Sequence, residues 1–342
     1  MSKEYNSKPV VVITGASAGV GRATAQAFGR LGASIGLLAR GQAGLEGAKA
    51  DVENDGGRAL IVKADVSDAE EVEQAAATVE DEFGPIDIWV NNAMVSVFAR
   101  AEEITPEEYK RVMDVNFLGY VNGTLAALKR MRKRNRGTIV QVGSALAYRG
   151  IPLQAAYCAS KHAVEGFTDS LRAEILHDKL NIHVTQVHLP AVNTPQFGWV
   201  RNKLGHHGQP VPPIFQPEVV ADAIVWAAHN KRREVFAGFP AAQAIVGNKL
   251  FPNIGDWYLA KNGYDAQKAD QPYDESQPDN LYHPLDDEED HGAHGAFGDN
   301  ARDDSWYIPI VKNRNPLALI GSMITGAVAM FGTNQRKEKT SG

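Results

Sequence analysis

Short apolar runs recur through the first 240 residues of the chain, and stretches with a helical spacing of apolar positions separate them. Runs of this kind, rich in Val and Ile, are typical of strands that are buried on both faces of a parallel sheet. Their alternation with helices predicts one α/β domain built on a doubly wound parallel sheet. We predict strands at residues 10–13, 34–39, in a run that closes at 64–66, and at 86–90, 137–142, 181–187 and 234–237.

A glycine-rich turn follows the first of these runs. Residues 14–21 read Thr-Gly-Ala-Ser-Ala-Gly-Val-Gly, and residues 22–28 continue with helical character. Glycines allow the backbone to approach a phosphate, and the start of a helix offers unpaired N–H groups together with the positive end of its dipole. The turn therefore predicts a nucleotide site, against the alternative of a βα turn without a ligand.

The second run ends at Ala39 and Arg40. An acidic side chain at this point of a dinucleotide fold accepts a hydrogen bond from the adenosine ribose 2′-hydroxyl, whereas a nearby Arg accommodates a 2′-phosphate. Ala39 has no carboxylate, and Arg40 offers a fork of donors. We predict NADP(H) in preference to NAD(H), with a solvated Arg at a strand end as the alternative.

Tyr157 and Lys161 stand four residues apart in a predicted helix, so they share one face of it. A phenol has an ordinary pKa of about 10, and a neighbouring ammonium favours the phenolate and lowers that pKa. The pair is a candidate general acid/base. A chance match on a surface helix is the alternative, because Tyr-x-x-x-Lys is a short pattern.

The glycine-rich turn and the Tyr157–Lys161 pair belong to a longer series of motifs along the chain. They are the Thr-Gly-x-x-x-Gly-x-Gly turn, Asp65, Asn91-Asn92-Ala93, Asn116, Ser144, Tyr157-x-x-x-Lys161 and Leu189-Pro190-Ala-Val-Asn-Thr194. In this order and spacing, across roughly residues 8–240, the chain resembles the short-chain dehydrogenases/reductases of the single-domain type, with a C-terminal extension. Met94 and Ala191 depart from that pattern, since the family commonly has Gly at both positions. The Met94 side chain is expected to narrow the space near the middle of the cofactor.

The resemblance implies an α/β, Rossmann-type, doubly wound parallel sheet of about seven strands with helices on both faces. It implies NAD(P)-dependent interconversion of a carbonyl and a secondary alcohol, in which Tyr157 transfers the proton and Ser144 hydrogen-bonds the same oxygen. Lys161 would lower the pKa of Tyr157 and hold the nicotinamide ribose, and Asn116 would bind a water that links Lys161 to solvent. A homodimer or homotetramer is expected on the same ground. A non-catalytic, cofactor-binding scaffold or redox sensor on this fold is the rival hypothesis.

The candidate site residues fall into three groups. The catalytic candidates are Asn116, Ser144, Tyr157 and Lys161. The cofactor-binding candidates are Gly15, Ser17, Ala18, Gly19, Val20, Gly21, Arg40, Asp65, Val66, Asn92, Ala93, Tyr157, Lys161, Pro190, Val192 and Thr194. The substrate candidates are Val95, Leu146, Gln154 and Phe197, and residues 194–216, rich in Gly, Pro and aromatic side chains, are a candidate lid over a small-molecule substrate. The histidines have no clustered partners, so we expect no metal site.

The last part of the chain has a different composition. Residues 241–261 have helical character, and residues 262–305 carry 13 acidic and two basic side chains. This predicts a catalytic domain over residues 1–261 and an acidic, largely unstructured linker over residues 262–311. Residues 312–342 are expected to contain a helix, because residues 315–335 have no charge. A helix of that length could cross a bilayer core of about 30 Å. A membrane anchor, a helix that covers an interface and a frayed tail all remain open.

Composition narrows the remaining possibilities. The 342 residues carry a net charge of −6, and no nucleic-acid-binding motif is present, so nucleic acid is not an expected partner. Cys158 is the only cysteine, which fits a reducing compartment. The first eight residues are polar and do not resemble a signal peptide. We expect a cytoplasmic protein, attached to the inner face of a membrane if the tail is an anchor.

Overall fold

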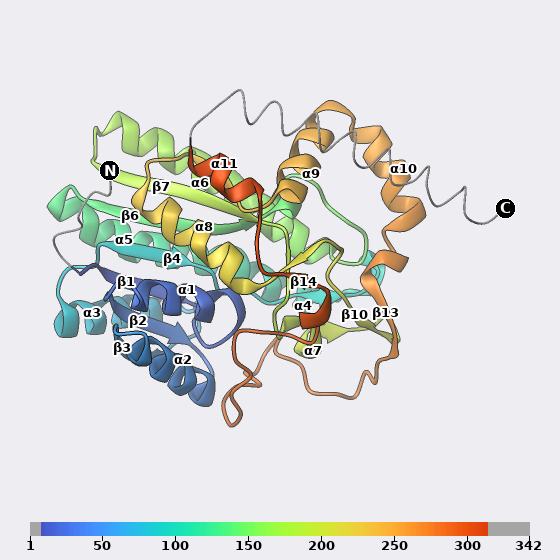
Figure 1. The fold of residues 1–342 in the computed structure, drawn as a ribbon, viewed down its shortest axis with the longest axis horizontal. Helices are drawn as coiled ribbons and strands as arrows, with labels where there is room; N and C mark the ends of the chain where they lie inside the picture. The colour runs from blue at the N-terminus through green and yellow to red at the C-terminus, as the bar shows by residue number, and fades with distance from the viewer. Residues whose placement is uncertain (1–7, 314–342) are drawn as a thin grey trace.

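A seven-stranded parallel sheet forms the centre of the molecule in the computed structural model, which describes residues 8–313 (Figure 1). The strand order is β12-β7-β6-β4-β1-β2-β3, with the crossover that defines a doubly wound sheet between β1 and β4. The strands are β1 (Val10–Thr14), β2 (Ser34–Ala39), β3 (Arg58–Lys63), β4 (Ile88–Asn91), β6 (Gly137–Ser144), β7 (Ile182–Leu189) and β12 (Glu234–Phe236). The predicted fold class is confirmed, although β3 ends just before the residues at which we expected it to close.

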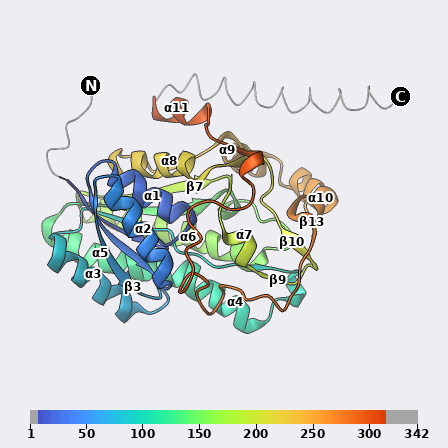
Figure 2. The ribbon, with the colours of Figure 1, turned by 60° about the horizontal axis from the view of Figure 1, so that its bottom comes forward.

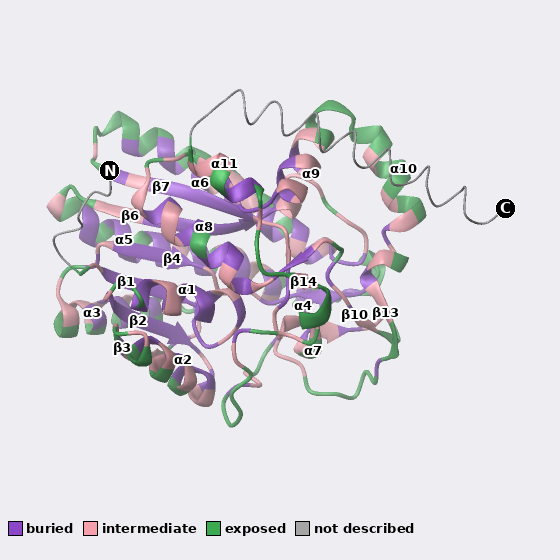
Figure 3. Cartoon of the chain, viewed as in Figure 1, coloured by how far each residue is buried: buried purple, intermediate pink, exposed green. Residues whose placement is uncertain are grey.

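Two helical layers cover the sheet because successive strand side chains point to opposite faces. Val11 and Ile13 of β1 pack in the core beneath α1 (Gly19–Gly29), α2 (Gln42–Asn54) and α8 (Pro217–His229). Val10 and Val12 pack in the other core, beneath α3 (Ala69–Phe83), α5 (Gly119–Arg134) and α6 (Ala155–His177). Figure 3 shows the central strands buried along their length, as the continuous apolar runs require.

Shorter elements surround the carboxyl edge of the sheet. These are β5 (Val97–Phe98), α4 (Pro106–Met113), a π-helical turn (Asp114–Leu118) that joins α4 to α5, β8 (Ala191–Val192), α7 (Gln196–Trp199), β9 (Arg201–Asn202), β10 (His206–Gly208) and β11 (Ile214–Phe215). The helix expected at 241–261 is two helices, α9 (Phe239–Leu250) and α10 (Pro252–Asn262). They separate at Phe251 because the following proline disfavours helical geometry in the residue before it.

The acidic segment after α10 follows a defined path against the sheet domain (Figure 2). Its regular elements are β13 (Lys268–Pro272), which pairs with β10, β14 (Ala301–Arg302), which pairs with β11, and α11 (Tyr307–Lys312). This differs from the largely unstructured linker that we expected. The physical reason is charge compensation, since acidic side chains of the segment form ion pairs with basic ones of the domain: Arg22–Asp290, Lys63–Asp287 and Arg201–Asp279.

The expected tail helix lies almost entirely outside the described residues, which end one residue after α11. Among residues 8–313, no helix combines the length and apolar character that crossing a membrane requires.

Candidate active site

A cavity of about 480 Å³ opens at the carboxyl ends of the central strands, where ligands bind in open α/β sheets. Its wall includes every predicted cofactor residue except Gly21, and it includes the four substrate candidates. Ser144, Tyr157 and Lys161 also line it, whereas Asn116 does not. Residues from both ends of the candidate lid, among them Thr194, Phe197 and Val211, complete the wall.

The turn between β1 and α1 explains why its glycines are needed. Gly15 has a φ of +65° and Gly19 a φ of +55°, in the left-handed region that other residues rarely adopt. A Cβ on Gly21 would lie 2.0 Å from the carbonyl oxygen of Gly15, so only glycine at position 21 allows α1 to approach the turn this closely. Thr14 Oγ1 accepts hydrogen bonds from the N–H groups of Asn92 (2.9 Å) and Ala93 (3.1 Å), which ties the ends of β1 and β4 together.

The first turn of α1 has no side-chain cap, since Ala18 at its N-cap has no side-chain acceptor. The N–H of Gly19 donates to the carbonyl of Gly292 and that of Arg22 to the carbonyl of Ala18, so the other N–H groups of this turn are the candidate phosphate donors. A glycine cradle at an uncapped helix start fits the diphosphate of a dinucleotide.

Tyr157 and Ser144 line the same cavity wall and hydrogen-bond each other. Ser144 ends β6, where its Oγ accepts a hydrogen bond from the N–H of Leu146 (3.1 Å). Burial raises the pKa of Tyr157 to about 12, although its hydrogen bond with Ser144 acts in the opposite direction. Tyr157 is therefore a protonated phenol at neutral pH, placed beside a second hydroxyl.

Lys161 differs in one respect from the role that we expected. Its Nζ donates to the Tyr120 hydroxyl and to the carbonyl of Val142, both at 2.9 Å, and lies 5.7 Å from the centre of the Tyr157 ring. Burial lowers the pKa of Lys161 to about 7. The expected lowering of the Tyr157 pKa by Lys161 is not seen, because loss of water on burial is the largest effect on both groups and disfavours both charged forms.

Asn116 lies in the π-helical turn and is fully buried. Its Oδ1 accepts from the N–H of Val95 (2.8 Å), and its Nδ2 donates to the carbonyl of Val95 (2.9 Å) and to Ser160 Oγ (3.1 Å). The side-chain amide is thus engaged with protein groups, and the expected contact of Asn116 with a relay water stays a prediction. In the structure the amide ties the turn to the cavity residue Val95 and to α6.

The comparisons with known proteins agree with this geometry. A family model described as short chain dehydrogenase matches residues 9–204. The chain belongs to the short-chain dehydrogenase family. It is an oxidoreductase that acts on CH–OH groups with NAD(P) as the partner in hydride transfer.

Two relatives and one solved structure illustrate the match. The chain is 35% identical to "Uncharacterized oxidoreductase YxnA" of Bacillus subtilis (strain 168) over 278 residues, which cover 80% of this chain and 77% of the relative. It is 34% identical to "Dehydrogenase/reductase SDR family member 7C" of Rattus norvegicus over 260 residues, 73% of this chain and 83% of the relative. It is similar to an alcohol dehydrogenase of the archaeon Thermococcus sibiricus solved with 5-hydroxy-NADP, with a TM-score of 0.59 and 28% identity over 67% of this chain and 96% of the other.

Tyr120 is a site residue of this short-chain dehydrogenase that sequence reasoning missed. It is 1% exposed, its hydroxyl donates to the carbonyl of Val142 (2.9 Å), and Lys161 Nζ lies 4.5 Å from the centre of its ring. Tyr120 follows Asn116 by four residues, so helical spacing could have placed the two on one face.

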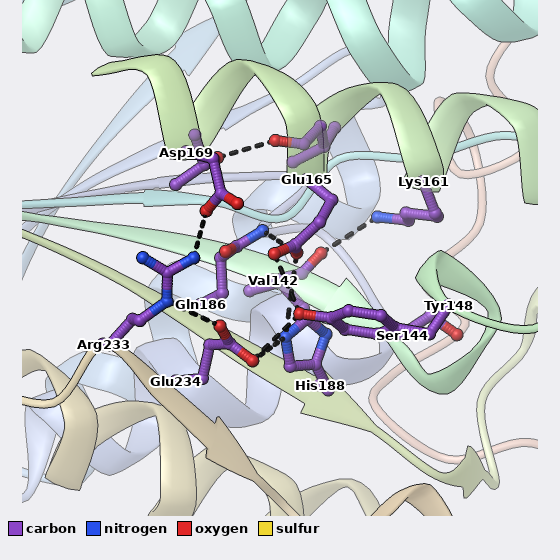
Figure 4. A network of polar contacts seen from close by, with 12 residues as sticks. Val142, Ser144, Tyr148, Lys161, Glu165, Asp169, Gln186, His188, Arg233 and Glu234 are labelled. Atoms are coloured by element: carbon purple, nitrogen blue, oxygen red, sulfur yellow. Dashed lines mark hydrogen bonds and ion pairs between the residues drawn. The ribbon is translucent and has the colours of Figure 1, made fainter. Parts of the chain in front are cut away.

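A polar cluster beneath the end of β6 was also missed (Figure 4). The Tyr148 hydroxyl hydrogen-bonds Glu165 Oε1 (2.8 Å) and Glu234 Oε2 (2.9 Å), and His188 Nε2 lies 3.6 Å from Glu234 Oε2. The proximity of His188, followed by the hydrogen bonds from Tyr148 and Arg233, lowers the pKa of Glu234 to about 2. Gly143 leaves room for His188, because a Cβ there would lie 2.8 Å from His188 Nδ1. The cluster joins β6, β7, β12 and α6 directly behind Ser144.

Arg40 and Asp65, which follow β2 and β3 on the cavity wall, are both engaged by other residues. Asp65 accepts from Arg111 (2.6 Å) and from Ser67 Oγ (2.7 Å). Burial alone would raise the pKa of Asp65, but these hydrogen bonds outweigh it and hold the pKa below its usual value. Arg40 donates to the carbonyls of Asn280 (2.6 Å) and Tyr282 (3.0 Å), so the acidic segment reaches into this part of the site. No local sequence signal predicts that contact.

Proposed function

We propose that this oxidoreductase reduces a carbonyl to a secondary alcohol, and catalyses the reverse reaction, with Tyr157 as general acid/base. The observation that carries the proposal is the meeting of Tyr157 and Ser144 on one cavity wall with Lys161 directly behind them. A nicotinamide bound in this cavity would supply or accept the hydride. The turn at Gly15–Gly21 and the N–H groups of α1 would hold the diphosphate, and Lys161 the nicotinamide ribose.

Tyr157 is suited to donating a proton to a carbonyl oxygen as that oxygen gains negative charge. With a pKa of about 12 it retains its proton at neutral pH, and an alkoxide is a stronger base than a phenolate. The Ser144 hydroxyl supports the same developing charge, in the way that preorganised donors stabilise an oxyanion. Lys161, with a pKa of about 7, holds or releases a proton near physiological pH, which supports a part in returning the proton to the site.

The cavity wall supports an apolar substrate. Val95, Leu146 and Phe197 line it, together with Ile151, Trp199 and Leu259. The one polar substrate candidate, Gln154, donates its side-chain amide to Gln267 (2.7 Å) and is 8% exposed. A mostly apolar wall with a few placed polar groups favours a hydrophobic ketone over a sugar.

Turnover of a panel of aldehydes, ketones, steroids and sugars, followed by nicotinamide absorbance with both NADH and NADPH, tests the proposal. Tyr157→Phe is expected to lower turnover about 10²–10⁴-fold while the affinity for cofactor, measured by fluorescence titration, stays within about twofold. Tyr258→Phe is the matched control, because Tyr258 lines the same cavity and is expected to keep most of the activity. Turnover that survives Tyr157→Phe would refute the assignment, and a parent protein that turns over nothing would favour the scaffold hypothesis.

A homodimer or homotetramer also belongs to this proposal. Leu118 and Leu125, beside and on α5, are 43% and 54% exposed, and Leu176 near the end of α6 is 77% exposed. Exposed leucines on neighbouring helices support a contact between copies through this layer. Light scattering of the purified protein and of Leu125→Glu tests it, and a monomeric parent would refute it.

Arg40 alone supports NADP(H) as the preferred cofactor, and the preference stays a prediction. The solved relative contains 5-hydroxy-NADP, which fits that prediction. Asp286 also lines this cavity wall, however, and the prediction from Arg40 did not take its carboxylate into account.

A further inference from the structure

Residues 279–292, here called the acidic strap, pass the end of β2 and contribute Asn280, Pro284, Leu285 and Asp286 to the cavity wall. The strap contacts the first two βα units through backbone groups. The N–H of Gln42 donates to Asp287 Oδ1 (2.9 Å), that of Gly44 to the carbonyl of Asp286 (2.9 Å), and that of Gly19 to the carbonyl of Gly292 (3.2 Å). The start of α2 is therefore capped by acidic residues that stand about 240 positions later in the chain.

Asp286 is the residue of the strap that enters the cavity. It is 6% exposed and lines the same wall as Ala39 and Arg40. Two glycines make room for its carboxylate, since a Cβ on Gly41 would lie 1.9 Å from Asp286 Oδ1 and one on Gly44 would lie 2.7 Å from Oδ2. Side chains at either position would displace it.

The Asp286 carboxylate is free to accept hydrogen bonds from a ligand. Within residues 8–313, the structure records a hydrogen bond to the Asp286 backbone carbonyl but none to its carboxylate oxygens, and no ion pair. These oxygens are not closed off from solvent, and Asp286 lines the cavity. A ligand in the cavity can therefore donate a hydrogen bond to Asp286.

The neighbouring charges are already balanced. Asp65 is paired with Arg111, and Asp287 with Lys63. Arg40 remains as the balancing charge for Asp286, but two of its donors are committed to strap carbonyls. A ligand with a hydroxyl at this place would satisfy Asp286 without adding charge. A phosphate monoester would bring further negative charge beside the Asp286 carboxylate, which is repulsive.

In dinucleotide folds the adenosine ribose lies at the end of the second strand, where an acidic residue accepts from its 2′-hydroxyl. Ala39 cannot do this. We propose that Asp286 takes that part from the far end of the chain, accepts the 2′-hydroxyl of NAD(H) and repels the 2′-phosphate of NADP(H). Arg40 then holds the strap in place rather than the phosphate. The inference rests on the proposed function only in requiring that the cavity binds a nicotinamide dinucleotide.

Binding titrations with NADH and NADPH, read by protein fluorescence and by calorimetry, test the inference without any substrate. The parent is expected to bind NADH at least tenfold more tightly than NADPH. Asp286→Ala is expected to reduce this ratio at least tenfold, mainly through tighter binding of NADPH. Asp286→Asn keeps the shape of the side chain and removes the repulsion, so it is expected to change the ratio in the same direction if the Ala variant does not fold. Glu288→Gln is the matched control, since it removes one negative charge from an exposed position two residues away and is expected to leave the ratio unchanged.

Arg40→Ala separates the two assignments of Arg40. If Arg40 holds the strap, the variant loosens Asp286, so NADH binding weakens and the NADH/NADPH ratio falls as in the Asp286 variants. If Arg40 binds a 2′-phosphate instead, NADPH binding weakens while NADH binding does not, and the inference is overturned. A parent that binds NADPH as tightly as NADH, or a ratio that neither Asp286 variant changes, would also overturn it while leaving the oxidoreductase proposal intact. Failure of the parent to bind either cofactor would instead overturn the proposed function.

Discussion

Burial of the charged Lys161 side chain lowers the free energy of unfolding, and this effect can be measured. Lys161 is 3% exposed, and burial lowers its pKa to about 7, whereas an unfolded chain has a lysine pKa of about 10.4. Each pKa unit corresponds to about 1.4 kcal/mol, so at or below pH 7 the shift destabilises the fold by about 5 kcal/mol. Between pH 7 and about 10.4 the unfolded chain binds one proton more than the folded one, so stability rises with pH and the cost disappears at the upper limit.

Lys161→Met removes the charge and keeps the length of the side chain. It also removes the two hydrogen bonds of Nζ, but the Val142 carbonyl retains its bond from Tyr120. Losing these bonds costs about 2 kcal/mol. The variant is therefore expected to be more stable than the parent by about 3 kcal/mol at pH 7 and less stable by about 2 kcal/mol above pH 10.4, while its turnover is lost.

Urea unfolding of both proteins at several pH values from 6 to 10.5 measures this difference. It is expected to fall by about 1.4 kcal/mol per pH unit within the window and to change sign inside it. Lys133→Met, at an exposed position of α5, is expected to show no such slope. A difference between Lys161→Met and the parent that is constant across pH would refute the reasoning, because it would mean that folding does not change the pKa of Lys161.

Two further predictions concern the cluster behind Ser144 and the glycine turn. The pKa of Glu234 is about 2 in the folded protein and about 4.3 in the unfolded chain, so its carboxylate contributes about 3 kcal/mol of stability above pH 4.3, and this contribution is lost as the pH falls to 2. Glu234→Gln is therefore expected to be less stable than the parent by about that amount at pH 7 and to approach the stability of the parent near pH 2. Chemical unfolding measures both differences, and equal losses of stability at the two pH values would contradict the prediction. Gly21→Ala is expected to lose cofactor binding, because its Cβ would clash with the Gly15 backbone. Gly166→Ala, in open space on α6, is the control and is expected to stabilise the fold by up to about 1 kcal/mol. Cofactor affinity is measured by fluorescence titration and stability by thermal unfolding, and a normal cofactor affinity in Gly21→Ala would contradict the turn geometry.

The central sheet could be predicted from the sequence because its signal is local. The strands contain short apolar runs, nearly continuous in β1 and β4, and the glycine turn, Ser144 and the Tyr157–Lys161 pair all lie at the ends of strands or on the helices beside them. The topology then brings these residues to one edge. The two-helix structure of 239–262 was missed, although Pro252 gave a local signal for it.

The rest of the site depends on contacts between residues that are distant in sequence. The strong negative charge of residues 262–305 indicated an unstructured linker, but the Arg and Lys residues that compensate it lie on other elements. The environment of Arg40 could not be predicted for the same reason. The sign of the Tyr157 pKa shift was missed because the sequence shows the neighbouring charge but not the depth of burial, and burial is the larger effect.

The ion pair between Arg22 and Asp290 joins residues 268 positions apart, which sets an order for folding during synthesis. Ribosomes add about 5–20 residues per second, so the acidic partner of Arg22 is made roughly 13 to 54 s later. The glycine turn and the first two strands thus leave the ribosome long before the strap exists. In a nascent chain Arg22 can already pair with Asp51, whereas Lys63 and Arg40 must wait for their partners in the strap. The contacts between the strap and the first two βα units therefore form only after the strands of the central sheet have been synthesised.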